Sequence, residues 1–78
     1  MWTTYKNLSG ESGVESYRYD EELFTWIEVE FTDGSRYLYT DESCGWITVL
    51  EMIEYAERGI YLNRYINYNQ PPYADVTR

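Results

Sequence analysis

Histidine is absent from this chain, and cysteine, proline and basic residues are scarce. The single cysteine, Cys44, excludes an internal disulfide and any zinc site built from cysteines, and it suits a reducing compartment. The chain has no Gly-x-Ser-x-Gly motif, no Walker loop and no Rossmann glycines, so the usual residues for acid-base, nucleophilic and phosphate chemistry are missing. We therefore expect no enzymatic activity, no metal ion and no cofactor.

Long apolar runs, a signal peptide and lipidation motifs are also missing, so we expect a soluble cytoplasmic protein. Its 78 residues make one domain with a small core. Six basic residues stand against 14 acidic ones, a net charge of −8 that opposes non-specific binding to nucleic acid or anionic lipid. Ten tyrosines supply much of the area that the core can bury.

Alternating residues predict two strands on either side of a turn at Asp20-Glu21-Glu22. The first is VESYRY, residues 14–19, and the second is LFTWIEVEF, residues 23–31, rich in β-branched and aromatic side chains. In the second strand Leu23, Thr25, Ile27, Val29 and Phe31 share one face, and Phe24, Trp26, Glu28 and Glu30 share the other. Ile27, Val29 and Phe31 are expected in the core.

Asp33-Gly34 predicts a hairpin into a third strand that contains Tyr37 and Tyr39. A two-residue loop puts both tyrosines on the outer face of the sheet. A three-residue loop with Gly34 in the left-handed bulge position puts them beside the apolar residues of the preceding strand and sets Glu30 opposite Arg36. The second register is favoured because it keeps that ion pair on the wet face and the rings in the core.

After Tyr39 the hydrophobic period becomes helical. Trp46, Val49, Leu50, Ile53 and Ala56 predict an amphipathic helix, which begins after capping residues at 41–43 and ends at Gly59. Residues 60–68 predict a second, short helix that stops before the two prolines.

The fold class is therefore α+β: a three-stranded antiparallel β-meander packed against one amphipathic helix, with a second short helix near the C-terminus. Residues 1–13 are expected to form a flexible arm, 14–70 the single domain and 71–78 a tail. The strand at 14–19 would be an exposed edge, which leaves a monomer and a homodimer through that edge both open.

Ordered marks along residues 12–68 resemble the KTSC domain, a short module at the C-terminus of some lysyl-tRNA synthetases that also occurs alone in bacterial and phage proteins. These marks are Tyr19-Asp20, Phe31 with Gly34, Tyr37 with Tyr39, and Gly59 with Tyr61 and Asn63. The resemblance implies a small α+β module, and RNA binding is the function suggested for that family. This chain departs from the family in its strongly negative charge, in a longer segment between Tyr39 and Gly59, and in lacking the proline before the helix.

Carboxylates form two rows in the predicted elements. Glu28 and Glu30 (the strand row) project from one strand face about 7 Å apart, and Glu51, Glu54 and Glu57 (the helix row) follow one helix face. Such rows can imitate a phosphate backbone toward a basic protein, as inhibitors from phages and mobile elements do. The alternative is that the two rows only solvate the exposed faces of the strand and the helix.

The segment ERGIYLNRYINYNQPPY, residues 57–73, interleaves cations, rings and amides, which single-strand binders use. Its candidate nucleic-acid contacts are Arg58, Tyr61, Asn63, Arg64, Tyr65 and Tyr68. The structural alternative is that these rings pack the short helix onto the sheet.

The sequence favours a non-enzymatic acidic module that binds a basic, nucleic-acid-binding protein through the two carboxylate rows, with Trp26 as an exposed anchor. The alternative function is an accessory domain for RNA or single-stranded nucleic acid. No membrane partner is expected. Cys44 is interpreted as a small structural residue, because no basic partner for its thiol lies nearby in the sequence.

Overall fold

The computed structural model describes residues 1–10 and 12–78. In these ranges the chain forms a five-stranded sheet and three helices. In chain order the elements are β1 (Thr3–Thr4), β2 (Val14–Tyr19), β3 (Trp26–Phe31), β4 (Arg36–Thr40), α1 (Asp41–Cys44), α2 (Trp46–Arg58), α3 (Leu62–Asn69) and β5 (Asp75–Thr77).

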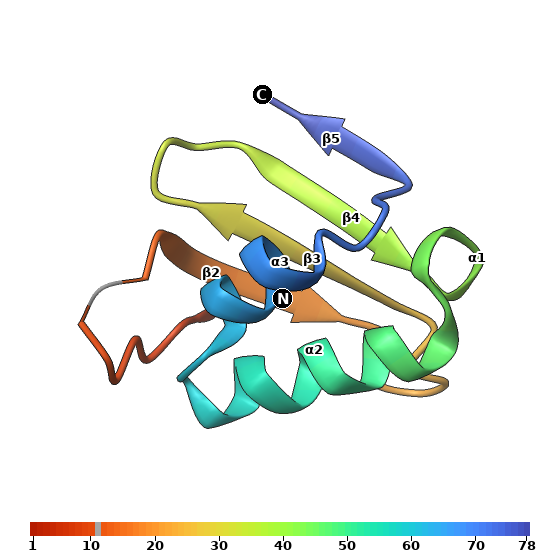
Figure 1. Cartoon of the computed structure of the whole chain (residues 1–78), viewed down its shortest axis with the longest axis horizontal. Helices are drawn as coiled ribbons and strands as arrows, with labels where there is room; N and C mark the ends of the chain where they lie inside the picture. The colour runs from red at the N-terminus through yellow and green to blue at the C-terminus, as the bar shows by residue number, and fades with distance from the viewer. Residues whose placement is uncertain (11) are drawn as a thin grey trace.

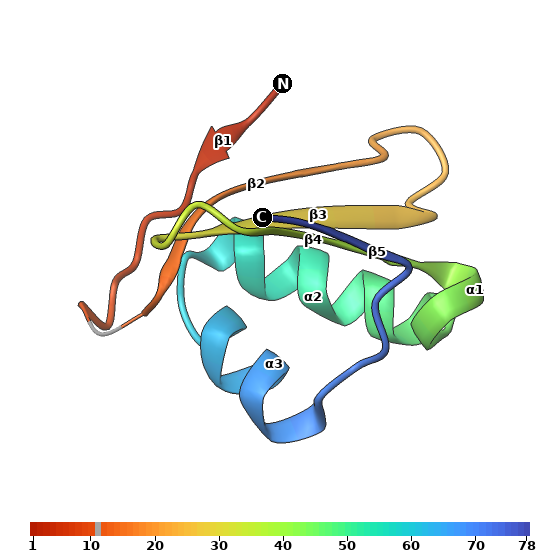
Figure 2. The same cartoon turned by 90° about the horizontal axis from the view of Figure 1, so that it is seen from above.

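The sheet is antiparallel throughout, and its strands lie side by side in chain order from β1 to β5. Figure 1 shows α3 in front of the sheet, and Figure 2 shows α2 and α3 on the same side of it. The N-terminus lies on the other side of the sheet (Figure 2). The fold is thus two layers, with one sheet face left without helices.

The predicted three-stranded meander with two helices is wrong, because the described residues add strands β1 and β5 and the short helix α1. The two added strands come from the segments that the sequence assigns to an arm and a tail. Both are too short, at two and three residues, for an alternating pattern to reveal them. They form because the sheet offers unpaired backbone groups on β2 and β4.

The edge expected at Val14–Tyr19 is occupied in part, because β1 pairs with Ser16 and Tyr17. Tyr5, directly after β1, is only 4% exposed, and its hydroxyl accepts a hydrogen bond from the backbone N–H of Leu62 at 3.2 Å. A large buried ring and a bond to the start of α3 therefore hold the N-terminal segment against the body of the protein.

The favoured hairpin register is confirmed: Glu30 lies opposite Arg36, with Tyr37 and Tyr39 opposite Val29 and Ile27. Gly34 has a φ of +91°, and the backbone N–H of Phe31 donates to Ser35 O at 2.9 Å. This is the three-residue loop with a left-handed glycine.

Strand β3 begins at Trp26, three residues later than the sequence predicts. Asp20 prevents an earlier start, because its carboxylate accepts hydrogen bonds from the backbone of Glu22, Leu23 and Thr25 and from the Thr25 hydroxyl at 2.7 Å. Residues 20–25 are therefore a capped loop. Leu23, expected on the inner face of the strand, is 76% exposed.

Helix α2 matches the predicted period and ends where expected, since Gly59 has a left-handed φ of +74°. The buried stripe consists of Val49, Met52, Ile53 and Ala56. Trp46 and Leu50, expected on the buried stripe, are instead 63% and 40% exposed. The buried stripe is therefore rotated around the helix axis relative to the predicted stripe. It includes Met52, which was not predicted, and excludes Trp46 and Leu50.

The capping residues at 41–43 form a separate helix. Thr40 caps α1, and its hydroxyl and that of Ser43 each bond to the other residue's backbone N–H at 3.0 Å. Gly45, with a φ of +91°, then interrupts the chain before α2. Helix α3 follows Tyr61, which is left-handed with a φ of +73°, and ends before the prolines as predicted.

The core lies between the inner sheet face and the helices. Ile27, Val29, Met52, Leu62 and Val49 are its largest fully buried side chains. Phe31, expected in the core, is half-buried at the sheet end. In the ranges that the structure describes, the helices are all too short or too polar to cross a lipid bilayer.

Candidate functional site

The strand row of carboxylates lies on the sheet face without helices and is neutralised there. The Glu28 carboxylate bonds to the Arg18 guanidinium at 2.8 Å, and the Glu30 carboxylate lies 3.2 Å from the Arg36 guanidinium. Only 16% of the Glu28 side chain and 23% of the Glu30 side chain are exposed. The hydroxyl of Ser16, followed by Arg36, lowers the pKa of Glu30. These two carboxylates have little charge left to offer a partner.

Trp2 covers this row. The guanidinium carbons of Arg18 and Arg36 lie 4.7 Å and 5.1 Å from the centre of its ring, within cation–π range. Trp26, predicted as an exposed anchor, is half-buried on the same strand face. The outer sheet face thus carries two ion pairs with the Trp2 ring over their guanidinium groups, and these contacts stabilise the N-terminal strand.

The helix row lies on the opposite side of the molecule, on α2. The Tyr17 hydroxyl donates to Glu57 at 2.6 Å, and the Tyr65 hydroxyl donates to Glu51 at 2.8 Å. Burial, followed by the bond to Glu51, raises the pKa of Tyr65 to about 12. Because a phenol is neutral, these bonds fix the orientation of both carboxylates without cancelling their charge.

Glu54 has a weaker arrangement. Its carboxylate lies 3.7 Å from the Arg58 guanidinium one turn away, and both side chains are more than half exposed. Exposed ion pairs at this spacing contribute only about 0.3–0.5 kcal/mol to stability. The Glu54 carboxylate can therefore leave Arg58 to bind a partner. The structure therefore brings the helix row together but separates it from the strand row, which lies on the other face of the sheet.

Exposed apolar side chains stand beside the helix row. Trp46 and Ile47 are 63% and 58% exposed in the first turn of α2, and Leu50 follows at 40%. Ile47, Leu50, Glu51 and Glu54 repeat at helical spacing on the side of α2 away from the sheet. We call Trp46, Ile47, Leu50 and the helix row (Glu51, Glu54 and Glu57) the acidic helix surface. The apolar half of this surface was not predicted, because the helical period placed Trp46 and Leu50 on the buried stripe and left Ile47 outside it.

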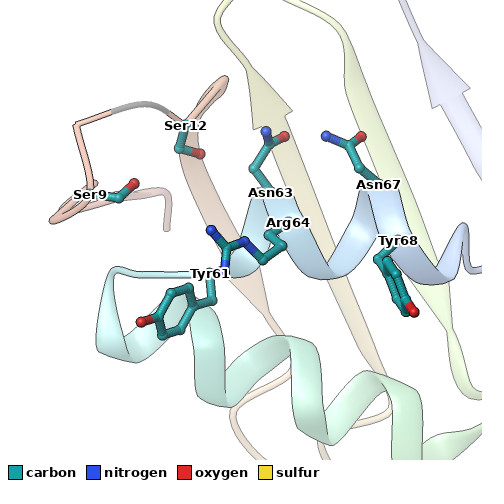
Figure 3. A pocket seen from close by; sticks show the side chains of 7 residues that line it. All are labelled: Ser9, Ser12, Tyr61, Asn63, Arg64, Asn67 and Tyr68. Atoms are coloured by element: carbon teal, nitrogen blue, oxygen red, sulfur yellow. The ribbon is translucent and has the colours of Figure 1, made fainter.

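Most of the predicted nucleic-acid contacts do meet in space. Tyr61, Asn63, Arg64 and Tyr68 line an open pocket of about 420 Å³ together with Ser9, Ser12 and Asn67. Figure 3 shows Asn63 and Asn67 on one side of α3 and Tyr68 on the other. Ser9 and Ser12 could not be predicted from the sequence, because only the fold brings the N-terminal loop against α3.

The remaining members of this segment have structural contacts. The Tyr65 ring packs on Tyr55 of α2 with ring centres 5.4 Å apart, and Arg58 pairs with Glu54. The Arg64 guanidinium lies 5.3 Å from the centre of the Tyr61 ring and makes no ion pair with any described residue. Tyr61, Arg64 and Tyr68, the last 87% exposed, are the exposed members of the set that make no ion pair with a described residue.

Cys44 is half-buried, and its thiol donates to the backbone oxygen of Thr40 at 3.3 Å. Burial raises the pKa of this thiol, which disfavours the reactive thiolate. Within residues 1–10 and 12–78, acidic and cysteine side chains do not gather in groups of three or more that could hold a metal ion.

The marks that resemble the KTSC domain have structural roles here. Asp20 caps the β2–β3 loop, Gly34 forms the hairpin turn, and Gly59 ends α2. A Cβ atom at Gly59 would lie only 2.4 Å from Cβ of Lys6, so glycine is needed for the close approach of the N-terminal segment. These roles explain Asp20, Gly34 and Gly59 without reference to a ligand.

Comparisons with protein-family models, with curated proteins and with solved structures give no match to this chain.

Proposed function

We propose that this protein is a non-enzymatic binding module that engages a basic protein through the acidic helix surface. The observation that carries this proposal is the pairing of Glu51 and Glu57 with the neutral hydroxyls of Tyr65 and Tyr17. These carboxylates are held in place and keep their charge, so a basic partner gains their attraction without the entropy cost of ordering them.

The exposed apolar residues supply the second half of the surface. A Trp, an Ile and a Leu next to carboxylates give a partner both area to bury and a charge to match, which is the composition of an interface centre. The net charge of −8 steers a cation toward the molecule as a whole. A single half-buried thiol at Cys44 fits a reducing cytoplasm.

The strand row has no part in this proposal, since Arg18 and Arg36 already bind it. Inhibitors from phages and mobile elements can mimic a nucleic-acid backbone with rows of carboxylates. If this protein does so, only the helix row can serve. The proposal itself needs only a basic segment with apolar residues on one side.

The test uses a fluorescent helical peptide of lysines and leucines as a defined basic probe. Fluorescence anisotropy should show binding that weakens with salt and falls at least about tenfold in the double variant Glu51→Lys, Glu54→Lys. The matched control, Glu15→Lys with Glu22→Lys, makes the same change in net charge at two exposed positions outside α2. Equal losses in the two double variants would mean that only net charge matters, and the acidic helix surface would be rejected.

A second candidate function is contact with single-stranded nucleic acid at α3. It is favoured by one observation, the Arg64 guanidinium over the Tyr61 ring at the mouth of the pocket in Figure 3. The resemblance to the KTSC domain points the same way. Labelled single-stranded RNA and DNA, titrated at low and then moderate salt, should bind in the micromolar range and be released by salt and by Arg64→Ala. No binding at low salt would exclude this function.

A further inference from the structure

Two hollows adjoin along one side of α3. The hollow in Figure 3, of about 420 Å³, lies at the start of the helix, and a larger one, of about 660 Å³, lies between the end of α3 and the β3–β4 hairpin. Asn67 lines both of them, and on the facing wall Ser12 lines the first and Gly13 the second. Each volume is within the range of about 300–1,000 Å³ that is usual for ligand sites. We call the pair of hollows the α3 groove.

Two asparagine amides of α3 lie in this groove. Asn63 and Asn67 are one helical turn apart, and Figure 3 shows both amides pointing the same way from the helix. Neither amide makes a hydrogen bond with any residue that the structure describes. In contrast, the amide of Asn69 donates to the backbone oxygen of Tyr65 at 3.1 Å. The donors and acceptors of Asn63 and Asn67 are therefore available to a ligand.

The spacing of these two amides matches an extended polypeptide. Residues four apart on a helix have Cβ atoms about 5–6 Å apart, and groups on one side of an extended chain repeat about every 6.6 Å. A carboxamide can donate to a peptide C=O and accept from a peptide N–H at the same time. Asn63 and Asn67 can therefore bind alternate peptide groups of one extended chain.

A cation stands at the first end of the groove. The guanidinium of Arg64 lies 5.3 Å from the centre of the Tyr61 ring, is exposed, and makes no ion pair with a described residue. A guanidinium binds a carboxylate through two parallel hydrogen bonds. The net charge of −8 repels a polyanion more strongly than a ligand with one negative group. Charge therefore favours a single carboxylate at Arg64.

The second end of the groove is apolar. Ile66 is half-buried and Pro71 is buried, and both line the larger hollow. Its aromatic wall is solid, because the rings of Phe31 and Tyr73 each pack on that of Tyr37 edge to face, with centres 5.5 Å and 4.9 Å apart. This end offers apolar surface on which a ligand side chain can lie.

The distance between the two ends sets the length of the ligand. Gln70 is the C-cap of α3, and the six residues from Arg64 to Gln70 rise about 9 Å along the axis. About three residues of an extended chain cover this length. A peptide with its carboxylate at Arg64 therefore places the side chain three residues earlier at the apolar end.

From these contacts we infer that the α3 groove binds the extended C-terminal segment of a protein. The terminal carboxylate pairs with Arg64, the peptide groups bond to Asn63 and Asn67, and an apolar side chain packs on Ile66 and Pro71. The site is separate from the acidic helix surface, which lies on α2. It shares Arg64 with the second candidate function, so single-stranded nucleic acid is the competing occupant.

The test is fluorescence anisotropy of the full chain with a hexapeptide of sequence GSLTSA, which carries a label at its N-terminus and a free C-terminal carboxylate. One control peptide ends in an amide, and the other has serine in place of leucine. We expect the amide to bind at least about tenfold more weakly, because it loses the charge-assisted bonds to Arg64. The serine peptide should bind about fivefold more weakly. Equal binding of the carboxylate and amide peptides, or no binding at millimolar concentration, would overturn the inference.

Two pairs of exposed positions give matched variants. Asn67→Ala should weaken binding of the carboxylate peptide by about fivefold, whereas Asn69→Ala, whose amide bonds within α3, should not. Arg64→Ala should abolish the preference for the carboxylate over the amide peptide. Arg58→Ala makes the same change in net charge and should keep that preference, because Arg58 pairs with Glu54. A preference that survives Arg64→Ala would reject Arg64 as the anchor.

The competing occupant and the two proposals can be separated. If single-stranded RNA binds, loses affinity in Asn67→Ala and displaces no hexapeptide, the groove is a nucleic-acid site and the inference is rejected. Glu51→Lys with Glu54→Lys should abolish binding of the lysine–leucine helix and leave the hexapeptide bound. If that double variant behaves as expected but the hexapeptide fails to bind, the acidic helix surface stands and the peptide groove is rejected.

Discussion

The hydroxyl of Tyr17 donates to the carboxylate of Glu57 at 2.6 Å, across 40 residues of sequence. Tyr17 belongs to β2 and is 4% exposed, whereas Glu57 lies on the exposed side of the last turn of α2. One short bond thus connects the sheet to the helix and orients a carboxylate of the helix row.

Tyr17→Phe should lower the free energy of unfolding by about 1–2 kcal/mol, because it removes a hydrogen bond to a charged group and leaves the ring in place. Urea unfolding at neutral pH measures this change. Glu57→Gln, which keeps an acceptor for the phenol, is the milder companion variant and should cost less. An unchanged midpoint for Tyr17→Phe would show that the bond contributes nothing to stability.

Gly59→Ala should destabilise the protein by about 2–3 kcal/mol, since its Cβ would meet Lys6 and its left-handed φ disfavours alanine. Gly34→Ala is the matched control: its φ is also positive, but a Cβ there would meet nothing within 4 Å. We expect about 1 kcal/mol for the control. Thermal unfolding of both variants measures the difference. Equal losses would mean that the contact between Lys6 and Gly59 does not form.

Tyr5→Phe should cost about 1–2 kcal/mol, because the buried backbone N–H of Leu62 loses its acceptor while the ring stays in the core. Hydrogen exchange at the Leu62 amide reports on the same bond and should speed up in the variant. If hydrogen exchange at the Leu62 amide and the free energy of unfolding are both unchanged, this bond does not hold the N-terminal segment, and the flexible arm that the sequence predicts for residues 1–13 is favoured.

Asp20→Asn should weaken folding at neutral pH and change the response to acid. The Thr25 hydroxyl and nearby backbone N–H groups lower the pKa of Asp20 from 3.8. A lowered pKa in the folded state means that the unfolded chain binds protons more readily, so this contribution is full above about pH 4 and is lost as the pH falls further.

Urea unfolding between pH 7 and pH 3 gives the measurement for Asp20. The wild type and Asp20→Asn should differ at pH 7 and converge at low pH. Glu22→Gln removes one charge from the same loop without touching the cap, and it is the control. Parallel curves for the wild type and Asp20→Asn would contradict the role of Asp20 as a charged cap.

Local features of the chain were predictable because their causes lie within a few residues. The left-handed Gly34 and the ion pair of Glu30 with Arg36 selected the hairpin register, and Gly59 marked the end of α2. The predicted start of β3 was wrong for an equally local reason. The carboxylate of Asp20 accepts hydrogen bonds from backbone N–H groups that a longer strand would need.

The candidate site was only partly predictable. The helix row is a regular repeat, and the sequence identified it. Its apolar neighbours were assigned to the core, because the period alone does not say which of two adjacent stripes the sheet will cover. The sequence correctly placed the strand row on the solvent side of the sheet. No sequence pattern indicates that Arg18 and Arg36 pair with these carboxylates or that Trp2 packs on the guanidinium groups.

By itself the sequence determined the α+β class, strand β2, the β3–β4 hairpin with its register, and the two longer helices, since periodicity, turns and caps act over short distances. The tertiary structure alone decided the edge strands β1 and β5, which carboxylates keep their charge, and the meeting of Phe31, Tyr37 and Tyr73. These depend on segments far apart in the chain, whose pairing is fixed by which backbone edges and ring faces the folded core leaves open.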